Sequence, residues 1–328
     1  MTTAQQLISL LKSHVEGDDE QFLTIALQAA ASEARRGHGK VAMQLRELVD
    51  AARANRERPP KRRSAPVPLA QPRGDLANLI AVRYADVRLS SMVLPEALDE
   101  RLRRVLREQR QRHRLLSHGL APRHKLLLIG PPGSGKTMTA SALAGELHLP
   151  LFTVQLDALM TKFMGETASK LRMVFTAMVE TKGVYFFDEF DAIGARRVER
   201  NDVGEIRRVL NSFLQFLEED ESEGLVIAAT NHPELLDPAL FRRFDDVIEY
   251  ALPSAEVAKR ILQARLATFD TEGLDWDAVV TAAGGMSQAE ISRAATDAAK
   301  LVVLEDRDRI TLRDLTAAVA ERKGAAHR

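Results

Sequence analysis

The stretch that decides the fold of this chain is Gly130-Pro131-Pro132-Gly133-Ser134-Gly135-Lys136-Thr137. It follows the apolar run from Leu126 to Ile129, which has the composition of a buried strand, and it opens a segment with helical spacing. Glycine lets the backbone wrap tightly, so its N–H groups point inward toward a phosphate while the helix N-terminus adds positive potential. The pattern G-x-x-x-x-G-K-[ST] between a strand and a helix therefore predicts a phosphate-binding loop.

Two side chains of this loop carry chemistry. Lys136 would reach the β- and γ-phosphates of a nucleotide, and the Thr137 hydroxyl would coordinate Mg²⁺. The alternative is a glycine-rich turn with an incidental lysine, which the full match in this context argues against. We therefore predict ATP or ADP and Mg²⁺ as cofactors. The predicted cofactor-binding residues of this segment are Gly130, Pro131, Pro132, Gly133, Ser134, Gly135, Lys136, Thr137 and Met138.

A second motif is Val184-Tyr185-Phe186-Phe187-Asp188-Glu189. Its four apolar residues predict a buried strand that ends in two acidic groups beside the phosphates. Asp188 would hold the Mg²⁺, and Glu189 is placed to orient or deprotonate the attacking water. A strand that ends in acids is common by chance, but an intervening strand and helix after Lys136 make this one specific.

Short apolar runs alternate with helical stretches through the middle of the chain. Buried strands in this arrangement predict an α/β fold with a parallel sheet between helices. After Pro253 only helices are expected, and one of them opens at Ser287 with Glu290 three residues on, which is a capping-box pattern. The predicted strands are Leu126–Ile129, Leu151–Leu156, Val184–Phe187, Leu225–Ala229 and Val247–Leu252.

The pattern divides the chain into four parts. Residues 1–56 have helical spacing and predict a small N-terminal all-α domain. Residues 57–75 hold five prolines and the basic run Lys61-Arg62-Arg63, and they predict a linker. Residues 76–252 are the expected nucleotide-binding part, and residues 253–328 are an expected C-terminal helical part.

Residues 120–253 resemble the nucleotide-binding module of the AAA+ ATPase superfamily. Besides the two phosphate motifs, Ala228-Ala229-Thr230-Asn231 resembles its first sensor, in which Asn231 would polarise the water near the γ-phosphate. Leu236 to Asp245 resembles the region of its arginine fingers, with Arg242 and Arg243 adjacent as in katanin- and spastin-like proteins. Which arginine acts stays open, and a surface ion pair with Asp245 or Asp246 is the alternative.

The resemblance also implies an assembly. An arginine finger acts across a subunit boundary, so each ATP site would be completed by a second copy in a homo-oligomeric ring, usually a hexamer. For residues 253–328 the AAA+ resemblance implies the role of a lid. Ala289 lies where the lid helix of AAA+ proteins approaches adenine, and Gln288 stands where relatives commonly have glycine. No second-sensor arginine is assigned, because Arg293 lies a turn too late.

The segment Lys162-Phe163-Met164-Gly165 resembles the loop that unfoldases and severing proteins project into a central pore to grip a polypeptide. In this interpretation Phe163 wedges between substrate side chains and Met164 adapts to their shape. The alternative places Phe163 in the core. Residues 196–204 are either a second pore loop or a solvated surface loop.

Composition excludes other classes. The chain has no cysteine, so disulfide scaffolds and thiol catalysis are excluded, and a reducing cytoplasmic location is expected. No apolar run reaches the roughly 18 residues of a membrane span, and no signal peptide is visible, so no membrane partner is expected. Lys plus Arg equals Asp plus Glu at 46 each, which does not favour a nucleic-acid partner.

The function that the resemblance implies is ATP hydrolysis that drives remodelling or threading of a protein client. Residues 1–56 would recruit the client, an adaptor, or a partner protease or other effector, as the helical domains of severing-type relatives do. One alternative is a DNA-acting AAA+ loader or helper, which should bring a DNA-binding domain. Another is a nucleotide-dependent assembly switch that threads nothing.

Overall fold

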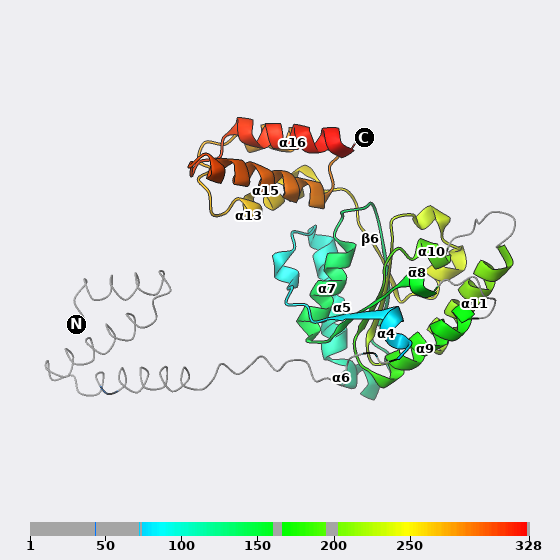
Figure 1. The fold of residues 1–328 in the computed structure, drawn as a ribbon. Helices are drawn as coiled ribbons and strands as arrows, with labels where there is room; N and C mark the ends of the chain where they lie inside the picture. Colours follow the sequence, from blue (N-terminus) through cyan, green and yellow to red (C-terminus); the bar gives the residue numbers. More distant parts are fainter. Residues whose placement is uncertain (1–42, 44–71, 73, 160–165, 195–202, 327–328) are drawn as a thin grey trace. The chain divides into compact units, whose positions relative to one another are not determined.

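The computed structural model of the chain describes residues 43, 72, 74–159, 166–194 and 203–326 (Figure 1). The chain divides into two compact units, Met1–Pro68 and Leu69–Arg328, and every described residue except Met43 belongs to the second. Apart from Met43, the predicted N-terminal domain lies outside the described residues, and so does almost all of the predicted linker. The division of the chain into four parts stays a prediction.

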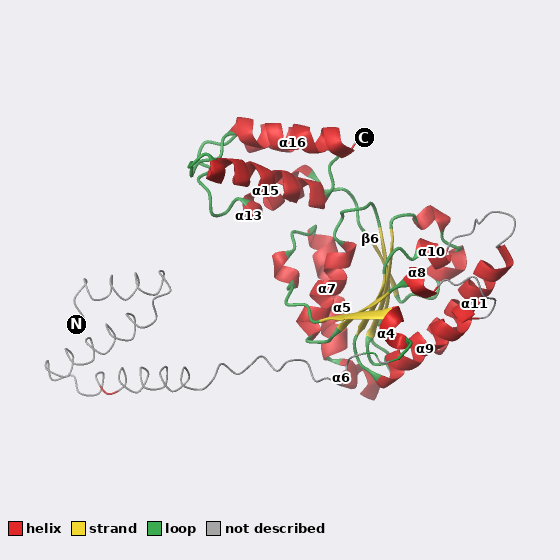
Figure 2. Cartoon of the chain, viewed as in Figure 1, coloured by secondary structure: helices red, strands yellow, loops and turns green. Residues whose placement is uncertain are grey.

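A mixed sheet lies between helices in the second unit (Figure 2). Among the described residues it has six strands in the order β1-β3-β4-β5-β2-β6. All neighbouring strands run parallel except β1, which pairs antiparallel with β3. The predicted α/β fold with a parallel sheet is thus confirmed. The strands are β1 Ile80–Arg83, β2 Lys125–Ile129, β3 Leu151–Val154, β4 Val184–Phe187, β5 Leu225–Thr230 and β6 Asp246–Glu249.

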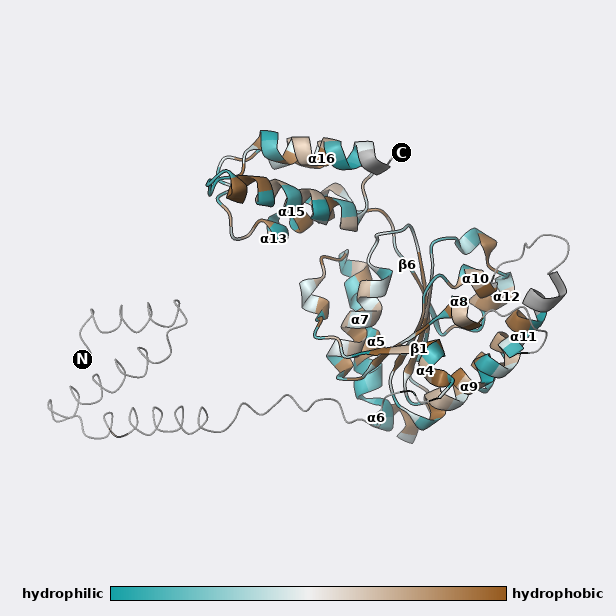
Figure 3. Cartoon of the chain, viewed as in Figure 1, coloured by the Kyte–Doolittle hydropathy of each residue, from teal (hydrophilic) through white to brown (hydrophobic). Residues whose placement is uncertain are grey.

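Helices cover both faces of this sheet, as Figure 1 shows. Successive strand residues point to opposite faces, so Leu126 and Leu128 pack with the helices of one side while Leu127 packs with those of the other. Figure 3 shows apolar strands between helices that combine apolar and polar residues, the pattern of amphipathic helices on a buried sheet. On the Leu126 side lie α5 Glu96–Arg110 and α7 Lys136–Leu147; on the Leu127 side lie α9 Glu166–Glu180 and α11 Val203–Glu219.

The core on the Leu127 side is built around Phe213 of α11, whose side chain is fully buried. Its ring lies 4.8 Å from the ring of Phe190, 5.4 Å from that of Phe187 and 5.6 Å from that of Phe175. Edge-to-face and tilted contacts at these distances add to the free energy gained from burial. This cluster fixes the end of β4, where Phe187 and Phe190 flank the acidic pair predicted from the sequence.

The structure differs from the sequence prediction by one residue at β2, which begins at Lys125, and at β5, which ends at Thr230, and it differs at three other strands. β1 was not predicted, because Ile80 and Val82 are its main apolar residues and it forms a short edge strand. The predicted strand over Leu151–Leu156 ends at Val154, and Leu156 begins the short helix α8 Leu156–Leu159. The last predicted strand begins one residue earlier, at Asp246, and ends at Glu249.

Several short elements complete this part of the chain. They connect the strands and position the loops at their ends. The helices are α4 Leu76–Leu79, α6 Arg112–Ser117, α10 Asp191–Gly194 and α12 Pro238–Phe241, and the 3₁₀ turns are η2 Leu89–Ser91 and η3 Pro233–Leu235.

The predicted lid, residues 253–328, has a hydrophobic core of its own, formed by residues such as Leu262, Ile291 and Val302. The predicted capping box is present: the Glu290 N–H donates to Ser287 Oγ, and the Ser287 N–H donates to the Glu290 carboxylate at 2.7 Å. These bonds satisfy N–H groups that have no partner within the helix. The lid helices are α13 Ala255–Arg265, α14 Trp276–Ala282, α15 Gln288–Leu304 and α16 Leu312–Ala326.

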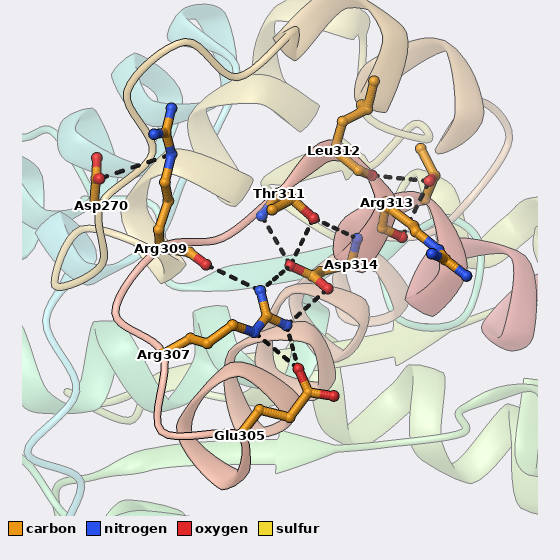
Figure 4. A network of polar contacts seen from close by, with 9 residues as sticks. Asp270, Glu305, Arg307, Arg309, Thr311, Leu312, Arg313 and Asp314 are labelled. Atoms are coloured by element: carbon orange, nitrogen blue, oxygen red, sulfur yellow. Dashed lines mark hydrogen bonds and ion pairs between the residues drawn. The ribbon is translucent and has the colours of Figure 1, made fainter.

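An ionic network joins the last two lid helices (Figure 4). Arg307, between α15 and α16, donates to both carboxylate oxygens of Asp314 at 3.0 Å and also to the carboxylate of Glu305. Hydrogen bonds from Arg307, despite the opposing effect of burial, lower the pKa of Asp314 to about 2. Asp314 also accepts from the Thr311 N–H, so one carboxylate fixes both the connection and the start of α16.

No helix within the described ranges has both the length and the apolar character needed to cross a membrane.

The central role of Phe213 gives a stability prediction. Phe213→Ala should lower the free energy of unfolding by about 3–5 kcal/mol, because the truncated side chain leaves a cavity among packed rings. Val179→Ala is the matched control, since Val179 is 65% exposed on α9 and its truncation removes few contacts. Denaturant titration checks both variants, and equal stability of the two would contradict the role of Phe213.

Candidate functional site

The predicted phosphate-binding loop lies at the carboxyl end of β2 and leads into α7. Gly130, Gly133 and Gly135 have φ values of 146°, 72° and 104°, a region that side chains other than glycine rarely adopt. A Cβ on Gly130 would lie 2.2 Å from the carbonyl oxygen of Tyr250, just beyond β6. The loop backbone therefore lies directly on the end of the neighbouring strand.

Tyr250 holds the residues at the two ends of the phosphate-binding loop. Its N–H donates to the Ile129 carbonyl at 2.7 Å, and its hydroxyl is hydrogen-bonded to the Thr139 hydroxyl on α7 at 2.6 Å. Burial raises the pKa of Tyr250 to about 12, so the phenol stays protonated and keeps this bond. Tyr250 thus connects β6 with both ends of the loop.

Lys136 is buried at the first position of α7, with 6% of its surface exposed. Its Nζ donates to the carbonyls of Gly130 and Pro131 at 2.7 and 2.9 Å and to Asn231 Oδ1 at 2.7 Å. Burial lowers the pKa of the ammonium, and the charge of Asp188 acts in the opposite direction. A buried cation surrounded mainly by neutral oxygens is stabilised by an anion, which a phosphate would supply.

The acidic pair lies at the carboxyl end of β4. The Thr137 hydroxyl donates to Asp188 Oδ2 at 3.0 Å, and the N–H of Glu189 donates to Asp188 Oδ1 at 3.0 Å. A hydroxyl and a carboxylate this close form the kind of hard oxygen donor set that Mg²⁺ prefers, so the residues fit the predicted metal. Glu189 is exposed toward the pocket and has a φ of 51°.

Lys136, Thr137 and the acidic pair line one pocket of about 560 Å³, which is large enough for a nucleotide. One part of its wall is Pro132 to Met138 together with Asp188, Glu189 and Asn231. The structure thus brings together the predicted phosphate, metal and sensor residues. The rest of the wall is Ser91, Met92, Val93, Ile261, Ala264, Arg265, Gln288, Ala289 and Ser292.

The lid contacts the phosphate-binding loop directly. The N–H of Ala289, at the start of α15, donates to the Gly133 carbonyl at 3.0 Å. A Cβ on Gly133 would lie 2.7 Å from Ser287 Oγ and 3.1 Å from the Cβ of Ala289. Glycine at this position therefore permits the close contact between the loop and the lid, and Ala289 lines the pocket.

Gly130 and Pro131 were predicted to contact the cofactor, but neither lines the pocket. Gly130 lies against Tyr250 instead, and the Pro131 carbonyl faces the Lys136 ammonium. The contribution of Gly130 is the close approach of two backbones, which the loop pattern alone does not distinguish from ligand contact.

Arg242 and Arg243 are exposed and do not line the pocket of their own chain. Arg243 forms an ion pair with Glu218 of α11. Asp245 instead accepts from backbone N–H groups at the start of β2, and Asp246 pairs with Arg101, so neither carboxylate forms the surface ion pair considered from the sequence. Arg242 forms no ion pair with any other described residue.

The proposed pore loop, Lys162, Phe163, Met164 and Gly165, lies outside the described residues, as does nearly all of the second candidate loop. Sequence reasoning also missed part of the pocket wall. Arg265 ends α13 and lines the pocket, whereas the considered Arg293 does not. A lone basic residue at a helix end belongs to no motif, so the sequence holds no signal that separates Arg265 from other surface arginines.

A parallel sheet with a glycine-rich loop, a buried lysine and an acidic pair at its carboxyl edge defines a phosphate-loop nucleotide hydrolase. The family model "ATPase family associated with various cellular activities (AAA)" matches residues 126–252. An uncharacterized AAA family ATPase, y4kL of Sinorhizobium fredii, is 34% identical over 323 residues, which cover 98% of this chain and 96% of that protein. The chain belongs to this AAA family and is an ATPase.

Other relatives match part of the chain. The proteasome-activating nucleotidase of Sulfurisphaera tokodaii is 37% identical over 214 residues, which cover 62% of this chain and 54% of that protein. The protein of the same name from Pyrococcus horikoshii is 37% identical over 208 residues, 61% of this chain and 52% of that protein. The chain thus spans about half the length of these nucleotidases.

The contact between loop and lid gives a prediction at Gly133. Gly133→Ala should weaken ATP binding by about tenfold or more, because the added methyl would push against Ser287 and would displace Ala289 of the pocket wall. Gly285→Ala is the matched control, since Gly285 also has a positive φ, 82°, but has no atom within 4 Å of an added Cβ. Titration calorimetry measures the affinities, and an equal loss in both variants would assign the effect to backbone strain alone.

The pocket wall gives a second prediction. Arg265→Ala should weaken ATP and ADP binding by about tenfold, because it removes a cation that can hydrogen-bond a charged or polar group of the nucleotide. Arg293→Ala should leave the affinity unchanged, since Arg293 is exposed on α15 away from the pocket lining. Unchanged nucleotide affinity of Arg265→Ala would show that Arg265 makes no such contact.

Proposed function

We propose that this ATPase remodels a protein client by threading it through a homo-oligomeric ring, with a hexamer as the expected size. The observation that carries the proposal is the similarity of about three fifths of the chain to proteins named proteasome-activating nucleotidases. Those names connect nucleotide hydrolysis with the action of a protease. A cytoplasmic location and a partner protease or other effector are parts of this proposal.

The pocket supports specific roles in hydrolysis. Lys136 holds the β- and γ-phosphates, and Thr137 and Asp188 hold Mg²⁺, which when bound would neutralise phosphate charge. Glu189 accepts the proton of the attacking water, and its exposure on the pocket leaves room for that water. Asn231 polarises the water, and its amide oxygen lies 2.7 Å from Lys136 Nζ, so both side chains reach the same end of the pocket.

The arginine pair supports a site shared between copies. Arg242 and Arg243 lie away from the pocket of their own chain, so either could act only on the nucleotide of a second copy. Arg243 is held by Glu218, whereas the Arg242 guanidinium is exposed and unpaired among the described residues. Arg242 is therefore the better candidate for the finger that completes the neighbouring site.

The proposed contact with the client rests on the sequence resemblance of residues 162–165 to a pore loop. In this proposal Phe163 wedges against the client chain, with Lys162, Met164 and Gly165 around it, and residues 1–56 recruit the client or an adaptor. Such a contact is independent of client sequence, because an aromatic ring packs against any side chain.

A complementation experiment tests the shared site. Arg242→Ala should lower the ATPase rate by about 10³-fold while nucleotide affinity is retained, because only transition-state charge loses its partner. Mixing it with Glu189→Gln subunits should restore activity, since the second variant supplies Arg242 to the intact pockets of the first. Arg243→Ala is the matched control and should stay active. Failure of the mixture to regain activity would contradict a finger supplied in trans.

A second experiment tests threading. Phe163→Ala should retain ATP hydrolysis but lose ATP-dependent unfolding of a tagged fluorescent protein, whereas Phe163→Tyr should retain much of both activities. The fluorescence decay, the ATPase rate and the melting temperature are measured on the same preparations. Unfolding at the parent rate by Phe163→Ala would contradict the pore-loop role. DNA-stimulated ATPase activity without unfolding would favour the DNA-acting alternative.

A further inference from the structure

A hydrogen-bonded clamp beside the pocket joins Asp191, the first residue of α10, to Thr230, the last residue of β5. The buried hydroxyl of Thr230 donates to Asp191 Oδ1 at 2.7 Å and accepts from the N–H of His232 at 2.9 Å. Neither Asp191 nor Thr230 lines the pocket. The clamp therefore belongs to the support of the site and not to its wall.

The clamp lies next to two residues that do line the pocket. Glu189 precedes Asp191 by two positions, and Asn231 directly follows Thr230. A backbone bond from the Phe190 N–H to the Ala229 carbonyl of β5, 2.8 Å long, joins the same two segments one position earlier. Glu189 and Asn231 are thus held at a fixed separation by two adjacent cross-connections.

The backbone conformation of Glu189 explains why this support is needed. Its φ of 51° is in the left-handed region, which disfavours a residue with a side chain and persists only when the surroundings hold it. The N–H of Glu189 is fixed by Asp188, and the following Phe190 is fully buried among aromatic rings. Asp191 then anchors the other end of this short segment to β5.

The end of β5 is held in the same way. The Thr230 carbonyl accepts a hydrogen bond from the Gly130 N–H at 3.3 Å. The Thr230 hydroxyl forms the two bonds of the clamp, to Asp191 and to the His232 N–H. The side chain of Asn231 extends from this fixed backbone to Lys136. A shift of Thr230 would therefore move Asn231 relative both to Glu189 and to the phosphate-binding loop.

We propose that Asp191, through its bond to Thr230, is a positioning residue for ATP hydrolysis that sets the relative placement of Glu189 and Asn231. The inference rests on the proposed roles of those two residues toward the attacking water. Since the clamp does not touch the pocket, it acts on the rate of the chemical step and leaves nucleotide binding intact. Small displacements of catalytic groups are enough to cause large losses in rate.

Four variants test the clamp. Asp191→Ala and Thr230→Val remove the hydrogen bond, and both should lower kcat by about tenfold or more with KM and nucleotide affinity nearly unchanged. Asp191→Asn and Thr230→Ser keep an acceptor and a donor, respectively, and should retain most of the parent rate. In the double variant Asp191→Ala/Thr230→Val the loss should be no larger than in the worse single variant, because both remove the same bond.

Asp275→Ala is the control, since Asp275 caps α14 in the lid through one hydrogen bond to a backbone N–H and has no connection to the pocket. It should leave kcat unchanged. The proposal is overturned if Asp191→Ala keeps the parent kcat, if Asp191→Asn is impaired as strongly as alanine, or if the loss follows melting temperature or nucleotide affinity. The Glu189→Gln variant distinguishes this proposal from the proposed function. Normal ATP hydrolysis by Glu189→Gln would refute the assignment of Glu189 as the base. A parent kcat in Asp191→Ala would refute only the positioning role of Asp191.

Discussion

The site depends on the close approach of one loop backbone to two others. Gly130 lies against the carbonyl of Tyr250 at the end of β6, and Gly133 lies against Ser287 and Ala289 at the start of α15. A side chain at either position would separate these layers. Because glycines stand at Gly130, Gly133 and Gly135, the loop backbone can enclose phosphates while it joins the sheet to the lid.

The strand order brings the remaining groups to this loop. β4, β5 and β2 are neighbours in the sheet, so Asp188 and Glu189, Asn231 and the phosphate-binding loop all follow parallel strands that end at one edge. The bonds from Lys136 to Asn231 and from Thr137 to Asp188 are direct results of that order.

Much of this arrangement could be predicted from the sequence, because its signals are local. Each of these signals depends on a few consecutive residues: the loop pattern, the buried strand before the acidic pair, and the Ser287–Glu290 capping box. What could not be predicted depends on tertiary packing. β1 has too few apolar residues to be recognised as a strand. Arg265 reaches the pocket only because of where α13 packs. Arg243 pairs with Glu218, which lies on a helix earlier in the sequence.

The measurement that tests the central claim most directly is a structure of the chain with Mg²⁺ and a non-hydrolysable ATP analogue. We expect the phosphates among the N–H groups of residues 133–137, with Lys136 Nζ turned from the Gly130 and Pro131 carbonyls toward phosphate oxygens. Ala289 should still donate to Gly133, with the base between the lid and Met92. An analogue bound elsewhere, or a loop released from Tyr250 and the lid when the analogue binds, would contradict this description of the site.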